Sequence, residues 1–586
     1  MNKLLTFLLS ISFSGLLCGQ GSLIPLGNEA YHILDRLEVK TGIKAPYHAA
    51  VKGWNRSDAI RYALRLDSAD FKRSSLDESD LLYLFLDNNE WLGIGQFATT
   101  LLGTKETTSQ GGTTQMEASL ADPRFVLSRR PIFKYFYQTP ANFFDINDKY
   151  FHIRVNPLLD LNVSKSEDRL YFMNMRGLQV RGGVDDRLYF FMNIQETQAG
   201  FPDYVNDRFD RYKYIPGQGF VKPYQSRLFD VENGHDYLNG QGYLGYNITR
   251  HVGMQFGYGK HFIGNGYRSL LLSDFSNNFL YLKINWKVWK FHYQNIFAEL
   301  TAGTHKSVPG GTLVNKKYMA AHYLSFRLLP NLELGFYETV IFSRTNHFEF
   351  QYLNPVILYR LVEHSIGSPD NILIGLNAKW NFLHRFQLYG QLMLDEFKFN
   401  ELFIDRNGWW ANKYGIQLGL KYYDVFGIDH FDLQAEYNSV QPYTYTFRDN
   451  SATYTHYDQP LAHPLGANFR EWILLGRYRL NSKWLLEGRV IGSNYGEDTP
   501  DENWGNNILL SYESRVRDYG NELGQGVKAR SLLAGFEVSY MVRHNIFLDA
   551  QMFYRNKNSE NNNLDQNLLY FGAGVRMNIA KNRMDF

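Results

Sequence analysis

The chain has 586 residues and a formal net charge of +2, with cations and anions interspersed along it. This pattern offers no clustered basic face, and so it argues against nucleic acid as a partner. Aromatic residues make up 16% of the chain, with 41 Tyr and 43 Phe, yet the mean hydropathy is negative. Alternating membrane strands with aromatic girdles produce this combination, whereas a soluble protein this aromatic would be hard to keep in solution.

The first residues follow the pattern of a secretory signal peptide. A positive start is followed by an apolar run at 4–17, which is too short to span a bilayer as a mature helix. We expect residues 1–19 to be removed. The only cysteine, Cys18, lies at this junction, and Leu16 and Leu17 before it disfavour a lipid anchor. The mature chain would then contain no cysteine, which excludes disulfides and thiolate metal sites.

The next segment, 20–103, is predicted to be a small α-helical domain in the periplasm. Its first helix carries an apolar stripe at helical spacing, made by Ala30, Ile33, Leu34 and Leu37. We expect a second helix with Ser57 as its N-cap and a third that opens with a capping box at 75–78. The Gly/Thr/Ser-rich stretch at 104–116 is typical of a flexible linker, which we assign to 104–130. The helices could lie under a barrel as a base or inside it as a plug, and we favour the base.

From about residue 150 the hydrophobic period changes from 3.6 to 2. In one example, Phe431, Leu433, Ala435 and Tyr437 alternate with Asp432, Gln434, Glu436 and Asn438. Such strands can turn one face to lipid and the other to a wet interior. No apolar run after the signal peptide reaches about 18 residues, so a membrane-spanning chain must here be a closed sheet. We therefore assign 131–586 to a transmembrane β-barrel with long extracellular loops.

The connections between strands distinguish a membrane barrel from a soluble sandwich, whose strands also alternate. Very short turns join several strand pairs, at 184–186, 250–252, 287–289, 329–331, 383–384, 481–482 and 543–545. Long connections alternate with them, at 199–240, 263–276, 300–315, 344–369, 399–412, 441–468, 495–527 and 556–565. Outer-membrane barrels place short turns in the periplasm and long loops outside.

This alternation also sets the strand count. Counting 506–515 as a strand would put two long connections in succession, so we include it in the loop 495–527. The predicted fold is all-β: an 18-stranded antiparallel outer-membrane β-barrel with a small N-terminal periplasmic α-helical segment. The last strand alternates from Leu569 to Met577, and the chain stops at Phe586. An alternating last strand with a terminal phenylalanine resembles the signal read by the outer-membrane assembly machinery.

Motifs for catalysis or cofactors are weak. The glycines at 257–266 lead to another strand and not to the helix that a phosphate-binding loop needs, so we interpret them as a rim or loop. The histidines of the external loops lack the i, i+4 partner of a helical metal site; they are His347, His364, His456 and His463. We predict no enzyme activity, no catalytic or metal-binding residue and no cofactor.

Charged residues on the polar strand faces are predicted to pair across the lumen and not to act as acids and bases. Opposite charges that share a poorly solvated interior stabilise each other only when they are paired. The residues concerned are Asp395, Glu436, Arg477, Arg479, Glu487 and Arg489.

Two external loops, one beginning at 344 and the other spanning 441–468, combine aromatic, amide and imidazole side chains. Such groups stack on sugars and form hydrogen bonds with them. The candidate ligand- or partner-binding residues are His364, Asp370, Asn371, Tyr457, Gln459, His463 and Asn468. Alternatively, the Pro, Gly and Asn residues only give each long loop a fixed shape in the barrel mouth.

Several longer motifs resemble the RemB-type gliding-motility proteins of Bacteroidetes. These motifs lie at 134–142, 263–274, 368–371 and 459–468, and the resemblance extends from about Tyr31 to the C-terminus. The family is similar in turn to the Wzi capsule-assembly family, whose members look like barrels of the same strand count closed by a periplasmic helical bundle. The resemblance implies a role at the cell surface, in gliding or in holding exopolysaccharide, with type IX secretion machinery as a partner. It carries over no catalytic residue.

The predicted function is therefore that of a non-enzymatic outer-membrane barrel acting in gliding motility or in exopolysaccharide and capsule attachment. Its partners would be outer-membrane lipid, surface polysaccharide, and motility or type IX secretion proteins. The alternative is an outer-membrane transport pore. Polar inner strand faces would permit a pore, but the loops and the N-terminal helices would obstruct it.

Overall fold

The computed structural model describes residues 21–91 and 136–586, except for positions 138, 149, 167–168, 186, 226–232, 305–312, 345–347, 357, 368–369, 397 and 562–563. The predicted signal peptide 1–19, the predicted linker 104–130 and His347 lie outside the described residues.

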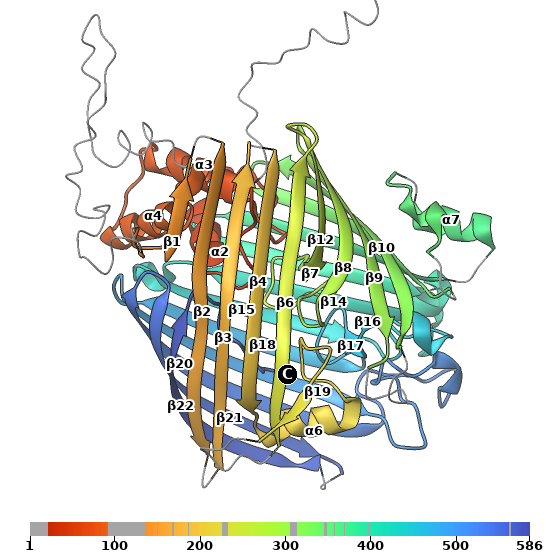
Figure 1. The fold of residues 1–586 in the computed structure, drawn as a ribbon. Coiled ribbons are helices and arrows are strands. Elements are labelled where there is room, and N and C mark those ends of the chain that lie inside the picture. Colours follow the sequence, from red (N-terminus) through yellow and green to blue (C-terminus); the bar gives the residue numbers. More distant parts are fainter. Residues whose placement is uncertain are drawn as a thin grey trace, which may run out of the picture.

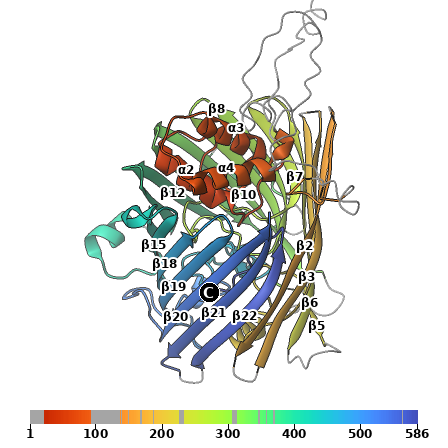
Figure 2. The same ribbon diagram turned by 90° about the vertical axis from the view of Figure 1, so that its left-hand side faces the viewer.

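The alternating segments form one closed antiparallel sheet (Figures 1 and 2). Of its 20 strands, β1 (Phe144–Asn147) and β5 (Lys222–Tyr224) are short additions paired with β2 and β6, which leaves 18 in the barrel wall. The wall closes where β2 (Phe151–Ser166) pairs with the last strand, β22 (Gln566–Met577). The predicted 18-stranded antiparallel barrel is confirmed.

The other wall strands follow in chain order, and each pairs with the next. They are β3 (Arg169–Val184), β4 (Leu188–Gly200), β6 (Gly234–Asn247), β7 (Val252–Gly259), β8 (Phe279–Val288), β9 (Phe291–Ala302), β10 (Asn315–Leu329), β11 (Leu332–Phe342), β12 (Asn371–Phe382), β13 (Phe386–Glu396), β14 (Lys413–Tyr422), β15 (Phe431–Val440), β18 (Phe469–Arg479), β19 (Trp484–Glu497), β20 (Val527–Arg543) and β21 (Ile546–Ser559). A separate small hairpin consists of β16 (Thr455–His456) and β17 (Gln459–Pro460).

Because side chains alternate along each strand, the barrel wall has an exposed apolar face on the outside and a face of inward-pointing side chains. In β22, Leu569 and Phe571 are 45% and 56% exposed on the outside of the wall. Tyr570, between them, faces inward and stacks on Phe553 of β21 with ring centroids 4.9 Å apart. An outer face with large exposed apolar side chains is the surface that a lipid environment stabilises.

Residues 506–515 do not form a strand, as the loop alternation predicted. The segment contains the short 3-10 helix η7 (Tyr512–Ser514), and its one sheet-like contact is an isolated bridge between Asn503 and Arg515. The connection between β19 and β20 is therefore one long external loop.

Three helices and a short 3-10 helix form the N-terminal domain: α2 (Ala30–Thr41), α3 (Arg56–Asp67), α4 (Ser75–Asp87) and η1 (Asn89–Trp91). Two predicted caps were wrong by one or two residues. Asn55 caps α3, because its side-chain oxygen accepts from the N–H of Ser57, 3.0 Å away. Ser74 caps α4 and forms the capping box with Asp77. Among the described residues, no helix has the length and apolarity needed to cross a membrane.

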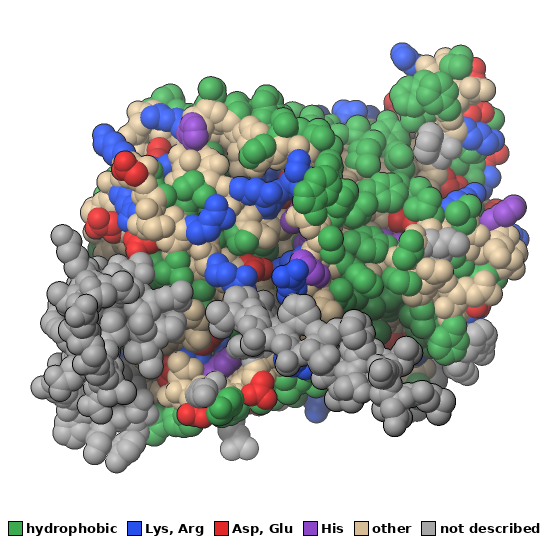
Figure 3. All heavy atoms as spheres, turned by 90° about the horizontal axis from the view of Figure 1, so that it is seen from above, with side chains coloured by type: hydrophobic (Ala, Val, Ile, Leu, Met, Phe, Trp, Pro, Cys, Tyr) green, Lys and Arg blue, Asp and Glu red, His purple; other side chains and the backbone are tan. Residues whose placement is uncertain are grey.

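The helical domain enters the barrel at the end that carries the short turns, which is the periplasmic end of such barrels (Figure 1). His48 lies 2.6 Å from the hydroxyl of Ser325, an inward-facing residue of β10. Nearer the rim, Asp35 pairs with Lys421 of β14 at 2.9 Å. The domain thus fills the mouth as a plug, whereas we had favoured a base. Viewed from this end, packed side chains cover the mouth wherever described atoms are in view (Figure 3).

Candidate functional site

Among the described residues, several segments occupy the barrel lumen. They include the helical domain, the lumenal loop (260–278, between β7 and β8), the cap loop (441–468, between β15 and β18), the C-terminal tail (578–586) and part of the connection after β4. The sequence predicted both loops at the external end of the barrel. Their return into the interior is what defines the candidate site.

The lumenal loop joins the helical domain to the barrel wall. Ile263 forms a β-bridge with Val51, and the Gly264 N–H donates to the Ala50 carbonyl at 2.8 Å. Leucines 270–272 are buried in the same apolar cluster as inward-facing residues of β10 and β11. Sequence reasoning missed this burial, although three leucines in a polar connection were a signal for it.

Glu436 of β15 fixes the middle of the lumenal loop. Its carboxylate accepts from the backbone N–H groups of Tyr267 and Arg268 at 2.6 and 3.0 Å, and from the hydroxyl of Tyr389 at 2.7 Å. The side-chain amides of Gln417 and Asn438 donate to it as well. Glu436 is 2% exposed, and these donors replace the water that its carboxylate lost. Glu436 therefore holds a loop in place and does not face an open channel.

The C-terminal tail turns back into the lumen after β22. Lys581 pairs with Glu487 and Glu537, the latter at 2.8 Å, and Arg583 lies 3.1 Å from Glu487. The ring of Phe586 lies under the guanidinium of Arg208, 4.6 Å from its carbon, and beside Tyr204 of α6 (Asp203–Tyr212). The last strand ends at Met577, where the predicted alternation also ends, and the charged tail after it finds its partners inside the barrel.

The predicted lumen charges all point inward, but only one of the expected pairings within that set forms. Arg477 pairs with Glu487 at 2.9 Å. The other ion pairs of these residues are made with residues outside the set: Arg477 and Arg479 both bind Glu29, Arg479 also binds Asp80, Arg489 binds Glu537, and Asp395 binds Lys413. Most of these partners come from the helical domain or from another wall strand, so spacing along one strand could not identify them.

In the cap loop, three candidate residues are fully buried and hold the loop in shape. Gln459 accepts from Gly217 N–H at 2.8 Å and donates to Gln218 O at 2.7 Å. His463 lies 2.7 Å from Glu471 of β18. Asn468, at a φ of 59°, donates to Gly496 and Gln525 and accepts from Gly524. Tyr457 occupies the β16–β17 turn and is partly exposed.

The loop that begins at 344 takes an unexpected route. The described residues of 348–366, here called the outer strap, include η3 (Phe350–Leu353) and α7 (Tyr359–Ile366) and lie against the outside of the wall (Figure 1). Asp370 fastens its base, because both carboxylate oxygens bind Arg344 at 2.8 Å. Asn371 begins β12 and donates to Ala452 O in the cap loop at 2.9 Å. His364 is exposed on α7.

The outer strap covers a polar row on the outer face of the wall. Asn295, His322 and Glu338 lie side by side on β9, β10 and β11, in register. The ring of Tyr359 lies 4.0 Å from that of His322, and Asn295 donates to Pro355 O at 3.2 Å. Polar groups on a lipid-facing wall are costly unless they have partners, and the strap supplies them.

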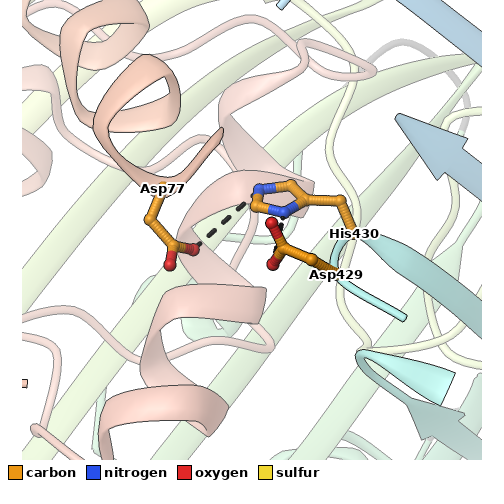
Figure 4. A group of neighbouring side chains, drawn as sticks. All are labelled: Asp77, Asp429 and His430. Atoms are coloured by element: carbon orange, nitrogen blue, oxygen red, sulfur yellow. Dashed lines mark ion pairs between the residues drawn. The ribbon is translucent and has the colours of Figure 1, made fainter. Parts of the chain in front are cut away.

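A cluster of charged residues, here called the latch, connects the helical domain to the turn between β14 and β15. Asp77, Asp429 and His430 converge there, with atoms that could bind a metal within 4.8 Å of one another (Figure 4). Arg36 already occupies the group, 2.7 Å from Asp77 and 3.2 Å from Asp429. Lys40 adds a second cation 2.7 Å from Asp77. Two cations neutralise these carboxylates, so the cluster is best explained as a salt-bridge latch.

The latch shifts the acidity of its own groups. Burial alone would raise the pKa of Asp77, but the Arg36 guanidinium and hydrogen bonds from Lys40 and Ser74 lower it below the usual range. Asp80 behaves alike: burial opposes ionisation, and Arg479 and His430 hold its pKa low. The ionised carboxylates therefore belong to the docked state of the plug.

No family model and no curated protein matches the chain. Among solved structures it is similar to Wzi of Escherichia coli, described as an outer membrane protein involved in group 1 capsule assembly and as a carbohydrate-binding β-barrel. The TM-score is 0.53 at 12% identity, over 96% of this chain and 100% of that one. It is also similar to OccK8 (OprE) of Pseudomonas aeruginosa, with a TM-score of 0.38 at 8% identity over 72% of this chain and 97% of that one.

The likeness to Wzi shows the fold: a closed barrel with N-terminal helices that spans nearly the whole chain. The protein is a multi-pass β-barrel of the outer membrane.

Proposed function

We propose that this protein is a non-enzymatic outer-membrane barrel that binds a surface polysaccharide and holds capsule or exopolysaccharide at the cell surface. The observation that carries the proposal is the full-length architecture shared with Wzi, a barrel described as carbohydrate-binding. The outer-membrane location gives the barrel access to such a polymer.

The rigidity of the cap loop supports binding. Gln459, His463 and Asn468 have buried partners on other elements, so the loop surface is ordered before any ligand arrives. Preorganisation of this kind reduces the entropy lost on binding. Within the cap loop, Tyr457 remains partly exposed and is the candidate for direct sugar contact. His364 of the outer strap is a second exposed candidate.

A constitutive transport pore receives less support, because the helical domain, the loops and the tail occupy the lumen and several of their charges are paired with the wall. A role in gliding motility, or in contact with type IX secretion proteins, rests on the sequence resemblance to RemB-type proteins alone. Either role is compatible with a barrel that holds polysaccharide.

The test compares cells that lack the protein with cells that carry the intact chain or Tyr457→Ala. The measurement is the ratio of cell-bound to released polysaccharide, with barrel assembly checked by heat-modifiable migration on gels. We expect loss of the protein to shift polysaccharide into the medium and Tyr457→Ala to shift part of it. An unchanged ratio in the null strain, together with no polysaccharide binding by the purified protein, would reject the proposal.

A further inference from the structure

The lumen holds a cavity of about 720 Å³ between the helical domain, the lumenal loop, the inner face of the barrel wall and the C-terminal tail. Its lining reaches from Asn545 in a periplasmic turn to Pro216 and Gly217 in the external connection after β4. Binding sites for small molecules occupy about 300–1,000 Å³, so the cavity has room for a ligand of several rings.

The lining carries an excess of positive charge. Eleven Lys or Arg residues line the cavity, against six Asp or Glu residues. Most of the arginines are already paired with carboxylates, but three lysines are not. Lys52, Lys260 and Lys283 form no ion pair, at N–O distances of 4.0 Å or less, with any described residue. Lys283 is buried, whereas Lys52 and Lys260 are half-buried and interact with Asp35 and Asp274 only from beyond that distance. An ammonium removed from water without a close carboxylate is costly, so an anion in the cavity would be stabilised by all three.

The environments of these lysines keep them available. Lys283 is 3% exposed, points inward from β8 and lies 5.7 Å from the ring of Tyr281. Lys52 lies 4.5 Å from the ring of Trp54. Burial lowers the pKa of Lys52 to about 8, partly opposed by Asp35, so its ammonium stays largely protonated at neutral pH.

Neutral polar groups in the same lining also lack partners. Asn265 is 1% exposed, and neither its amide nitrogen nor its amide oxygen has a hydrogen bond to any described residue. The Nε2 of His261, 7% exposed, is equally without a partner among the described residues, while its ring packs on Tyr281 at 4.3 Å. Unsatisfied amide and imidazole groups beside tyrosine rings are suited to hydroxyl-rich rings.

We propose that this cavity is a lumenal binding site for an anionic saccharide, in which Lys52, Lys260 and Lys283 pair with its carboxylate or phosphate groups and Asn265 and His261 bind its hydroxyls. The inference rests on the proposed polysaccharide function and adds to it that the saccharide is anionic and that it binds in the lumen. The site lies inside the barrel and not on its external surface.

The test uses the full chain in detergent, with Lys52, Lys260 and Lys283 all changed to Gln. A matched control changes three exposed lysines outside the cavity to Gln, at 165, 483 and 528, and so makes the same change in net charge. Calorimetric titration with trigalacturonate, glucose 1-phosphate and neutral maltotriose measures binding. Heat-modifiable migration and circular dichroism verify that each variant folds.

We expect the intact chain to bind trigalacturonate or glucose 1-phosphate more tightly than maltotriose, with binding that weakens as salt is added. The cavity variant should lose about ten-fold or more in affinity for the anionic sugar while the control loses little. Equal affinity for the charged and neutral sugars, or equal affinity of the cavity and control variants, would overturn the lumenal site.

Failure of the two proposals can be told apart. If the intact chain binds the native polysaccharide but the cavity variant binds it equally well, the lumenal site is wrong and the polysaccharide function stands. If the intact chain binds neither the native polysaccharide nor any of the three sugars, both are wrong. An Asn265→Ala variant provides a second test, because it should weaken sugar binding without altering its dependence on salt.

Discussion

Arg268 and Asp585, which are 317 residues apart in the chain, meet inside the lumen with Nη1 of the arginine 3.3 Å from Oδ1 of the aspartate. On its other side Arg268 lies 3.3 Å from Glu471 of β18. The pair fastens the C-terminal tail to the lumenal loop. The tail is thereby part of the filling of the barrel and not an extension of its last strand.

Removal of residues 581–586 should open a path through the lumen. Glu487 and Glu537 would lose the cations of Lys581 and Arg583, and the space that the tail occupies would fill with water. We expect the truncated protein to conduct ions in a planar bilayer far more than the intact one. Exchanging the two cations, as Lys581→Arg with Arg583→Lys, keeps both charges and should leave conductance low. Equal conductance of the truncated and the intact protein would show that the tail does not block the passage of ions through the lumen.

The Arg36→Ala substitution should weaken docking of the plug. Arg36 is fully buried and binds Asp77 and Asp424, so its loss leaves carboxylates uncompensated. Breaking a buried ion pair on one side costs about 3–5 kcal/mol. The measurement is trypsin cleavage of the helical domain as a function of urea. The control is Arg61→Ala, which removes an exposed guanidinium and leaves Asp58 its other partner, Lys287, so that about 0–1 kcal/mol is expected. Identical urea profiles for the two variants would contradict the latch.

Acid should loosen the same junction. The pKa of Asp77 and that of Asp80 are lower in the docked plug than in an unfolded chain. A lowered folded-state pKa contributes stability above the unfolded value of about 3.9, and that stability is lost as the pH falls through the folded-state pKa. Hydrogen exchange in α2 and α4, corrected for intrinsic rates, should therefore rise between pH 6 and about pH 3.

An Asp77→Asn variant tests the origin of that acid response. It should be less stable at neutral pH and should show a smaller change on acidification, because one of the titrating groups is gone. A pH response as large as that of the intact chain would assign the effect to other carboxylates.

The outer strap should detach when Tyr359 is replaced by alanine. Tyr359 is fully buried against His322, and removal of a large buried aromatic side chain costs about 3–5 kcal/mol. We expect faster proteolysis within 348–366 while the barrel keeps its heat-modifiable migration. His364→Ala alters an exposed residue of the same helix and should leave the cleavage rate unchanged. Equal rates in the two variants would mean that the strap does not depend on this contact.

The sequence by itself determined the barrel. Side-chain alternation of period 2 sets the two faces of each strand, and short turns between long connections set the number of strands at 18. It also located the three helices, since their apolar stripes and polar caps are local signals; only the caps of α3 and α4 were misplaced. All of these features depend on residues close together in the chain.

Only the tertiary structure decided what fills the barrel and what covers it. The contacts that fill the lumen join residues far apart in the chain, and no local pattern specifies such partners. Examples are Glu436 with Tyr267 (169 residues apart), Arg36 with Asp424 (388) and Arg268 with Asp585 (317). Connection length predicted the lumenal loop and the outer strap at the external end of the barrel. Their positions follow instead from the need of buried charges and apolar side chains to find partners once the wall has closed.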